Sequence, residues 1–342
     1  MSQPQPAVTF DEIRALLREL PGPDLESGTA ATARQAVLTK PRGSLGRLED
    51  LAVWLATWQR RHPPQLRRAR VSVFAGNHGV AAAQAVSAYP VAVTAQMVQN
   101  FIDGGAAVNR ICETTDAELR VYELNLEQPT ADFTRGPAMG EEECAHAVAY
   151  GLMAAEQGLD LLCLGEMGIG NTTAASALCL ALFGGEARDW VGPGTGVDEA
   201  GLARKAAAIA AALAANPTAA QDPLEALRCV GGYELAAIVG AVIAARLANT
   251  PVVLDGFVCT AAAAVLYRLD RRALDHCIVA HRSAEPAHAR LLQAIGQKPL
   301  FDFGMRLGEG SGAALAIPIL KAAAACHDGM ATFEQAGVSG PA

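Results

Sequence analysis

The spacing of apolar residues changes along the chain and separates a helical head from a region of alternating strands and helices. In the first sixty residues, apolar positions recur at helical spacing and predict helices over 9–20 and 24–38. Thr9 is placed to cap the first helix, with Glu12 completing a capping box. The same spacing returns over 48–58. We therefore expect three helices before the first strand.

Beyond residue 66, short apolar runs alternate with helical stretches. Several runs lack a polar face, as is typical of parallel strands buried on both sides. The predicted strands are 71–75, 119–124, 159–164, 252–254 and 277–280. The predicted helices are 94–102, 141–156, 172–182, 200–215, 234–247, 259–269 and 311–326. This alternation predicts an α/β fold with a doubly wound, mostly parallel sheet and helices on both faces.

The two patterns divide the chain into three parts. Residues 1–65 are expected to form the N-terminal helical part of a small domain. Residues 66–300 would form a Rossmann-like α/β domain that carries the site. Residues 301–342 would form a C-terminal segment with a glutamate-containing loop and a helix, which joins the N-terminal helices in the small domain.

Composition narrows the class of protein. Of the 342 residues, 51% are hydrophobic but only 5% are aromatic, and 33 glycines supply tight turns, which suits helices packed closely on a sheet. The net charge of −8 argues against general nucleic-acid binding, which needs a basic face. One basic run stands among prolines, and we interpret it as a solvated linker: Arg60, Arg61, Arg67, Arg68 and Arg70.

Further features favour a cytoplasmic protein. The longest apolar run, 235–245, is too short for a membrane span, which needs roughly twenty residues. The N-terminal segment is polar and proline-rich, without a signal-peptide pattern. The eight cysteines include no C-x-x-C pair. Four have aliphatic neighbours and are expected to be buried in a reducing compartment: Cys163, Cys229, Cys259 and Cys277.

Polar, glycine-marked motifs follow four of the predicted strands. Strand 71–75 runs into GNHGV, strand 159–164 into GEMGIGNTT, strand 252–254 into DGF and strand 277–280 into HRSAEP. In open α/β sheets, ligands bind beyond the carboxyl ends of the strands. The four motifs are therefore expected to line one cleft.

One motif combines glycines with hydrogen-bond donors as an anion site does. In the stretch LGEMGIGNTTAAS, Gly168 and Gly170 let backbone N–H groups approach an anion. Asn171, Thr172 and Thr173 add donors at a helix N-terminus, where the helix dipole favours negative charge. The stretch is a phosphate loop or, alternatively, an ordinary helix cap after a glycine turn.

A related stretch, LGEGSGAALA, points to different chemistry. Glu309 lies there between two glycines, and the following helix lacks the polar donors. A carboxylate in this place suits proton transfer or stabilisation of a cation, or else it favours the helix dipole. Lys205, after another glycine-rich loop, either reaches a phosphate or lies on an exposed helix face. Asp255 either contacts a ribose hydroxyl or caps the helix that follows it.

Negative observations limit the chemistry. A lone histidine after a strand, such as His78, is more often a hydrogen-bonded structural residue than a base. His281 and His288 lack cysteine or aspartate partners at metal-ligand spacing, so no zinc site is expected. No strand end carries the adjacent acidic pair common in enzymes that use phosphoribosyl pyrophosphate. If this protein transfers a ribosyl group, its donor is expected to need no metal.

Nine segments in order give the chain a family resemblance: KPRGSLGRLE, FAGNHGV, VSAYP, TAQMVQNF, GEMGIGNTT, GPGTGVD, LDGF, AHRSAEP and RLGEGSGAALA. Together they resemble the nicotinate-nucleotide:dimethylbenzimidazole phosphoribosyltransferases over residues 40–321, nearly the whole chain. Each motif is weak alone, but nine in order are specific. The resemblance implies a homodimer with a doubly wound sheet and a small helical domain drawn from both termini.

The resemblance also implies a reaction. Nicotinate mononucleotide would give its 5-phosphoribosyl group to 5,6-dimethylbenzimidazole, a step in assembling the lower ligand of cobalamin. The products would be α-ribazole 5′-phosphate and nicotinate, with inversion at the anomeric carbon. The donor's pyridinium is already a cationic leaving group and no pyrophosphate leaves, so neither a metal nor another cofactor is expected.

Site roles follow from the matching motifs. Glu309 is implied as the general base that takes a proton from the acceptor. The phosphate site carries over onto Gly168, Gly170, Asn171, Thr172 and Thr173, with Lys205 as charge partner. The ribose side is assigned to Glu166, Asp255 and Ser283, and the acceptor pocket to Ser72, Tyr89 and Leu307. Many members have aspartate where this chain has Asn77, so Asn77 is given no catalytic role.

Two other functions remain open at this point. A nicotinamide-linked dehydrogenase on the same fold is one, although the glycine fingerprint of such enzymes lacks its third glycine here. A non-catalytic nucleotide sensor that keeps the pocket is the other.

Overall fold

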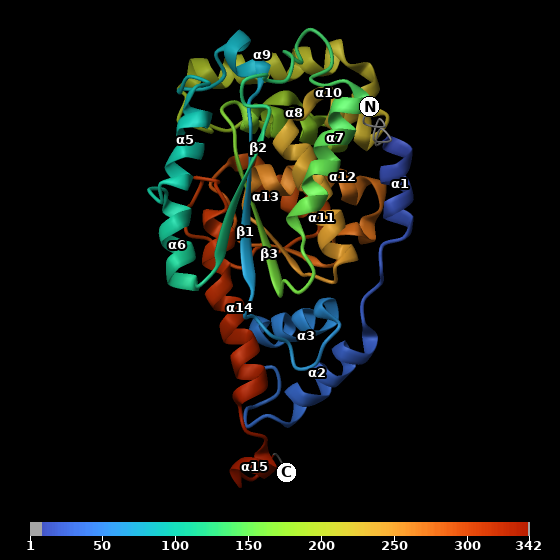
Figure 1. The fold of residues 1–342 in the computed structure, drawn as a ribbon, viewed down its shortest axis with the longest axis vertical. Coiled ribbons are helices and arrows are strands. Elements are labelled where there is room, and N and C mark those ends of the chain that lie inside the picture. The colour runs from blue at the N-terminus through green and yellow to red at the C-terminus, as the bar shows by residue number, and fades with distance from the viewer. Residues whose placement is uncertain (1–8, 341–342) are drawn as a thin grey trace, which may run out of the picture.

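A five-stranded parallel sheet organises the computed structural model, which describes residues 9–340 (Figure 1). The polar N-terminal segment, residues 1–8, lies outside the described residues, as do residues 341–342. The strand order is β2-β1-β3-β4-β5. The strands are β1 (Ala69–Gly76), β2 (Glu118–Leu124), β3 (Leu161–Met167), β4 (Val252–Leu254) and β5 (Cys277–Val279). All five predicted strands are confirmed within a few residues.

The helices surround this sheet and extend below it. They are α1 (Phe10–Arg18), α2 (Leu25–Val37), α3 (Arg47–Gln59), α4 (Gly79–Gln84), α5 (Val93–Ile102), α6 (Ala107–Thr115), α7 (Glu141–Gly151), α8 (Asn171–Phe183), α9 (Glu199–Ala215), α10 (Pro223–Val230), α11 (Tyr233–Leu247), α12 (Phe257–Leu269), α13 (Pro286–Ile295), α14 (Ser311–Gly329) and α15 (Phe333–Ala336). Short 3-10 helices lie at Leu152–Ala154, Ala187–Trp190, Pro217–Ala220 and Arg271–Leu274.

Two apolar cores lie on opposite faces of the sheet. Along β3, Leu162 and Leu164 point to one face, and Leu161 and Cys163 point to the other. The first core contains residues of α7, α8, α11 and α12, and the second contains residues of α6 and α14. The predicted sheet with helices on both faces is therefore confirmed.

The chain reverses its direction of winding at β1. After β1 it forms β2 on one side, and it then crosses to form β3 on the other side of β1. In such sheets the crevice beyond the carboxyl ends of the two central strands is where ligands bind. Here that crevice lies between β1 and β3, next to Gly76 and Met167.

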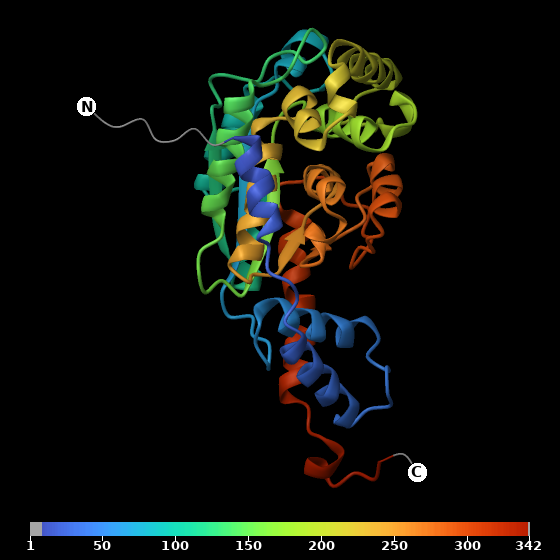
Figure 2. The same ribbon diagram turned by 90° about the vertical axis from the view of Figure 1, so that its right-hand side faces the viewer.

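A small helical unit lies at the amino end of the sheet. Helix α2 packs on α3, and the long helix α14 runs from the sheet down to both of them (Figures 1 and 2). Helix α1 has the predicted capping box at Thr9 and Glu12. It packs on α7 of the large layer, with Phe10 and Ile13 in the first core. The prediction that grouped α1 with the small unit is therefore corrected: its apolar face completes the large core.

One surface prediction is also corrected. Arg70, assigned to a solvated linker, is fully buried in β1, where it pairs with Glu118 at 2.8 Å and Glu156 at 2.9 Å. These carboxylates compensate for the desolvation of the guanidinium. Arg60, Arg67 and Arg68 are exposed as expected. In the described part of the chain, no helix is long and apolar enough to cross a membrane.

Close glycine contacts bring α7 and α11 together over the sheet. A methyl group at Gly151 would overlap the carbonyl of Ala237, and one at Gly240 would overlap the carbonyl of Val148. Nearly every residue of α11 is buried, so neither helix can move aside without opening the core. The two glycines therefore set the distance between these helices.

We expect Gly240→Ala to destabilise the fold. Alanine normally favours a helix over glycine by about 1 kcal/mol, but overlap with Val148 should cost about 1–3 kcal/mol beyond that gain. Urea unfolding measures the difference. The control is Gly136→Ala, where no atom lies within 4 Å of the added carbon, and its stability should change by less than about 0.5 kcal/mol. Equal stability of G240A and the unmodified protein would contradict the packing argument.

Candidate active site

A cavity of about 690 Å³ lies at the carboxyl edge of the sheet. It takes residues from β3, from the start of α8, from α5, and from the loops after β4 and β5 and before α14. Its lining consists of Tyr89, Val93, Met97, Glu166, Met167, Gly168, Ile169, Asn171, Thr172, Gly194, Thr195, Gly256, Phe257, Val258, His281, Ser283, Glu285, Arg306, Leu307, Gly308 and Glu309. Three of the four motif-bearing strand ends contribute to this lining, so the prediction of one shared cleft largely holds.

The predicted phosphate loop forms the start of α8. Gly170 is the N-cap residue with φ +98°, a conformation that suits glycine, and Gly168, Asn171 and Thr172 line the cavity. The Asn171 side chain donates to the Glu166 carboxylate rather than into the cavity. Thr173 is fully buried, and within residues 9–340 its hydroxyl has no partner. Gly170 and Thr173 are not among the residues that line the cavity, so a direct contact of these two residues with a phosphate stays a prediction.

The buried Lys205 side chain contacts the start of α8. Its ammonium group donates to the Thr172 hydroxyl at 3.0 Å and to the Gly192 carbonyl at 2.7 Å. Burial lowers the pKa of Lys205 to about 8, and the charge of Glu285 opposes that effect. The lysine is 1% exposed, so the alternative of a surface lysine is wrong. Its charge instead lies beneath Thr172, next to the cavity.

Glu309 projects from a tight turn that leads into α14. Gly308, Glu309 and Gly310 all have positive φ, at 81°, 64° and 75°. Glycine adopts this region freely, whereas for glutamate it costs about 1–2 kcal/mol. The Glu309 N–H donates to the Glu166 carbonyl at 3.0 Å, which joins the turn to the end of β3. The two glycine-glutamate stretches of the sequence are therefore in direct contact.

Acidic side chains are crowded at this junction. Burial and the negative charge of Asp255 raise the pKa of Glu309 to about 7. Burial also raises the pKa of Glu166 well above its usual range, with further contributions from Asp255 and Glu234, while the hydrogen bond from Asn171 opposes the shift. A carboxyl group with a pKa near 7 can exchange protons at neutral pH.

Asp255 has a different place from the one predicted. It is fully buried behind the Glu309 turn, and its carboxylate accepts the N–H groups of Gly310 at 3.1 Å and Ala313 at 2.9 Å. It therefore caps α14, and not α12, the helix that follows it in the chain. A contact with ribose is not supported, because its carboxylate is engaged on the far side of the turn.

Of the other residues predicted to contact a substrate, three line the cavity and one lies inside the sheet. Tyr89 and Leu307 line the cavity and are both 55% exposed, and Ser283 lines it as well. Ser72 lies in the middle of β1, fully buried opposite Leu164 of β3. The prediction that Ser72 contacts the acceptor is therefore not supported, since strand residues there face the sheet core.

Several lining residues were not selected from the sequence. Glu285 accepts the Gly194 N–H at 2.8 Å, and Arg306 donates to the Gly194 carbonyl at 2.6 Å. Burial raises the pKa of Glu285, and Lys205 opposes that shift. These residues lie inside the GPGTGVD, AHRSAEP and RLGEG motifs, so the motifs could have identified them as site residues. Val93 and Met97, four residues apart on α5, add an apolar wall.

His78 has the structural role expected of it. Its Nε2 lies 2.6 Å from the Glu234 carboxylate, and both side chains are fully buried. A methyl group at Gly170 would contact the His78 side chain, and one at Gly168 would approach the Glu234 carboxylate at 3.4 Å. The pair therefore packs against the glycine turn before α8. Asn77 donates to the Leu126 carbonyl at 2.8 Å.

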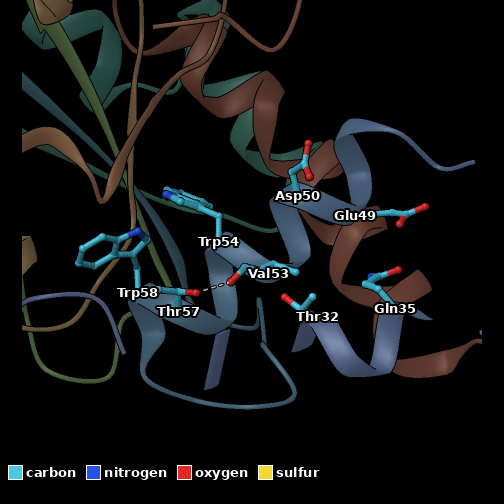
Figure 3. A pocket seen from close by; sticks show the side chains of 8 residues that line it. All are labelled: Thr32, Gln35, Glu49, Asp50, Val53, Trp54, Thr57 and Trp58. Carbon is cyan, nitrogen blue, oxygen red and sulfur yellow. Dashed lines mark hydrogen bonds between the residues drawn. The ribbon is translucent and has the colours of Figure 1, made fainter. Parts of the chain in front are cut away.

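A second cavity lies in the small helical unit, between α2 and α3 (Figure 3). It is lined by Thr32, Gln35, Glu49, Asp50, Val53, Trp54, Thr57 and Trp58. The Thr57 hydroxyl donates to Val53 within its own helix at 2.8 Å, and Glu49 pairs with Lys40 at 2.8 Å. None of the described residues that line this cavity is a glycine, in contrast to the cavity at the sheet edge, so we place the candidate active site at the sheet edge.

Comparison with known proteins gives a consistent result. A family model described as phosphoribosyltransferase matches residues 20–338. A Brucella anthropi protein named nicotinate-nucleotide–dimethylbenzimidazole phosphoribosyltransferase is 57% identical over 331 residues, which cover 97% of each chain. A Brucella canis protein of the same name is 58% identical over 330 residues, 96% of this chain and 97% of that protein.

A solved structure agrees with these relatives. The crystal structure of the Thermus thermophilus protein of that name has a TM-score of 0.85 at 42% identity. It covers 92% of this chain and 99% of the other. The protein is thus a phosphoribosyltransferase, and the chain belongs to the nicotinate-nucleotide:dimethylbenzimidazole phosphoribosyltransferase family.

Proposed function

We propose that the protein transfers the 5-phosphoribosyl group of nicotinate mononucleotide to 5,6-dimethylbenzimidazole. The products are α-ribazole 5′-phosphate and nicotinate, with inversion at the anomeric carbon. One observation carries the proposal: the N-terminus of α8 and the Glu309 carboxyl line the same cavity. An anion site and a proton acceptor are the two groups that this reaction needs. We further propose that the protein acts as a cytoplasmic homodimer.

The donor phosphate binds at the start of α8. The Thr172 hydroxyl accepts a hydrogen bond from Lys205, which leaves its own hydrogen free to donate to a phosphate oxygen. The helix dipole and the buried Lys205 charge both favour an anion there. A bound phosphate would also favour the charged form of Lys205, whose pKa burial lowers to about 8.

The acceptor binds between the apolar wall and Glu309. One ring nitrogen attacks the anomeric carbon as the bond to the pyridinium nitrogen breaks, and that bonding pair leaves with nicotinate. Glu309 takes the proton from the other ring nitrogen, which neutralises the developing benzimidazolium. Its pKa of about 7 keeps a large fraction ionised at neutral pH and makes it an effective base.

Carboxyl oxygen atoms in the cavity favour the transition state. The reacting sugar develops oxocarbenium character, as in glycoside cleavage, and the donor ring carries positive charge before the bond breaks. Glu166 and Ser283 line the cavity and are assigned to the ribose side. Carboxyl groups fixed before the reaction stabilise such a cation without reorganisation.

The reaction itself is the first test. Incubation of the protein with nicotinate mononucleotide and 5,6-dimethylbenzimidazole should form α-ribazole 5′-phosphate, identified by mass spectrometry and by the anomeric NMR signal. We expect turnover in the presence of a chelator. A β product, or absence of product with and without added Mg²⁺, would contradict the proposed function.

Replacement of Glu309 by glutamine should lower kcat by about two to four orders of magnitude, the usual contribution of a positioned general base. Donor affinity should stay within twofold, because the phosphate end of the site is untouched. In the unmodified protein, kcat/KM should fall below pH 7 as Glu309 becomes protonated. The variant should lack this acidic limb. Turnover at the unmodified rate would remove Glu309 from the mechanism.

Replacement of Thr172 by valine should weaken donor binding. It removes a hydrogen bond to an ionised phosphate, worth about 1.5–3 kcal/mol, which corresponds to a roughly 10- to 100-fold rise in the donor Kd. Calorimetric titration with nicotinate mononucleotide measures this effect. The matched control is Thr173→Val, one residue along the same helix but behind the cavity face. Equal losses in both variants would move the phosphate away from Thr172.

A further inference from the structure

Helix α14 begins without a capping side chain of its own. Its N-cap residue is Gly310, which has no side chain to satisfy the first N–H groups of the helix. We propose that Asp255 supplies this cap and thereby acts as a positioning residue, which holds the Glu309 carboxyl at the cavity. This inference rests on the proposed role of Glu309 as the base.

Asp255 ties three segments together. Its backbone N–H donates to the Leu164 carbonyl at 3.2 Å, which fixes it to β3. Its two carboxylate oxygens each accept one N–H of the α14 start, from Gly310 and Ala313. Both oxygens are thus used toward the residues that flank the Glu309 turn. The side chain is fully buried, so water does not compete for these bonds.

The turn needs such support because its conformation is unfavourable. Three consecutive residues with positive φ include one that is not glycine, Glu309. A backbone of this kind persists only where its surroundings fix it, and the fixed points here are Glu166 and Asp255. The Glu166 carbonyl binds the Glu309 N–H, and Asp255 binds the next N–H in the chain. Within the turn, the Ser311 N–H and hydroxyl both donate to the Gly308 carbonyl, at 3.1 Å and 2.7 Å. Without the Asp255 bond, the turn keeps these local bonds but loses one of its two links to the sheet side of the site.

The start of α14 packs closely on Asp255 and His281. A methyl group at Gly312 would overlap the His281 ring and come within 2.7 Å of the Asp255 carboxylate. The His281 Nε2 lies 3.5 Å from the same carboxylate, and its ring stacks on Phe301 with centroids 5.9 Å apart. His281 also lines the cavity. The pair therefore forms the wall between the cavity and the start of α14.

Asp255 acts on Glu309 through charge as well as position. Asp255 behind the turn and Glu166 on β3 are the ionisable groups that interact with the Glu309 carboxyl, and His281, Glu285 and Arg306 line the same cavity. Of these charges, that of Asp255 raises the pKa of Glu309. Loss of this negative charge should lower that pKa and leave a weaker base.

The test is Asp255→Asn in the full-length protein. The amide keeps the shape but loses the charge and one of the two acceptor oxygens. We expect kcat to fall at least tenfold with the KM for nicotinate mononucleotide within twofold. The acidic limb of kcat/KM should move to lower pH, because Glu309 ionises more easily. Hydrogen exchange at the Gly310 and Ala313 amides should become faster.

A matched control separates capping from positioning. Asp222 caps its own helix, α10: one carboxylate oxygen accepts the N–H groups of Leu224 at 2.9 Å and Glu225 at 3.1 Å, and the other pairs with Arg14 at 2.8 Å. Asp222→Asn should lower the thermal midpoint, as the loss of any cap does, but leave the pH profile unmoved. If D255N behaves like D222N, with no shift of the acidic limb and unchanged kcat, Asp255 is a structural cap alone and the inference fails.

Two further variants keep the outcome decisive. In a Glu309→Gln background, D255N should lower kcat by less than twofold, because a positioning residue has no target left. A full tenfold loss there would overturn the inference, whereas an active E309Q variant would overturn the proposed base instead. Should D255N not fold, Asp255→Glu keeps the charge but moves the carboxylate oxygens away from the Gly310 and Ala313 amides, and kcat should fall at least tenfold. Unchanged kcat in a folded D255E variant would also overturn the inference.

Discussion

The contact between Gly165 and Gly310 is the constraint on which the site depends. A side chain at Gly165 would overlap the backbone of Gly310, and one at Gly310 would crowd Val71 of β1. Because both positions are glycine, the start of α14 lies directly against the end of β3. This approach lets the Glu166 carbonyl accept the Glu309 N–H, and it brings two carboxyl groups from distant parts of the chain to one cavity. A larger residue at either position would separate these groups.

The same approach concentrates negative charge in a region of low dielectric constant. Glu166, Glu309 and Asp255 are all buried, and the charge of Asp255 disfavours ionisation of both glutamates. Asn171 and the first amides of α14 compensate for part of this cost. The part of this cost that is not compensated would be offset by a substrate that carries a positive pyridinium and passes through an oxocarbenium-like state. Carboxyl groups crowded around one cavity are therefore the arrangement that a cationic reaction centre would favour.

Most of the fold could be predicted from the sequence because its signals are local. Buried parallel strands appear as apolar runs, and all five runs form strands. Long helices such as α11 were visible from composition and length. Helices α4, α6, α10, α13 and α15 were missed, and each of them has ten residues or fewer. Arg70 was misplaced because its partners, Glu118 and Glu156, lie far along the chain.

The site residues also fall into those that a local motif predicts and those that depend on distant contacts. Glycine turns, the start of α8 and Glu309 are encoded within a few residues, so their motifs predicted where they lie. Asp255 could not be placed in this way, because the amides it accepts are 55 and 58 residues further along the chain. Spacing alone favoured a cap for the adjacent helix, yet the N-cap of that helix is Gly256, and the carboxylate turns toward α14 instead. A cap borrowed across the fold requires two elements to meet, and only the glycine contact between β3 and α14 allows that meeting.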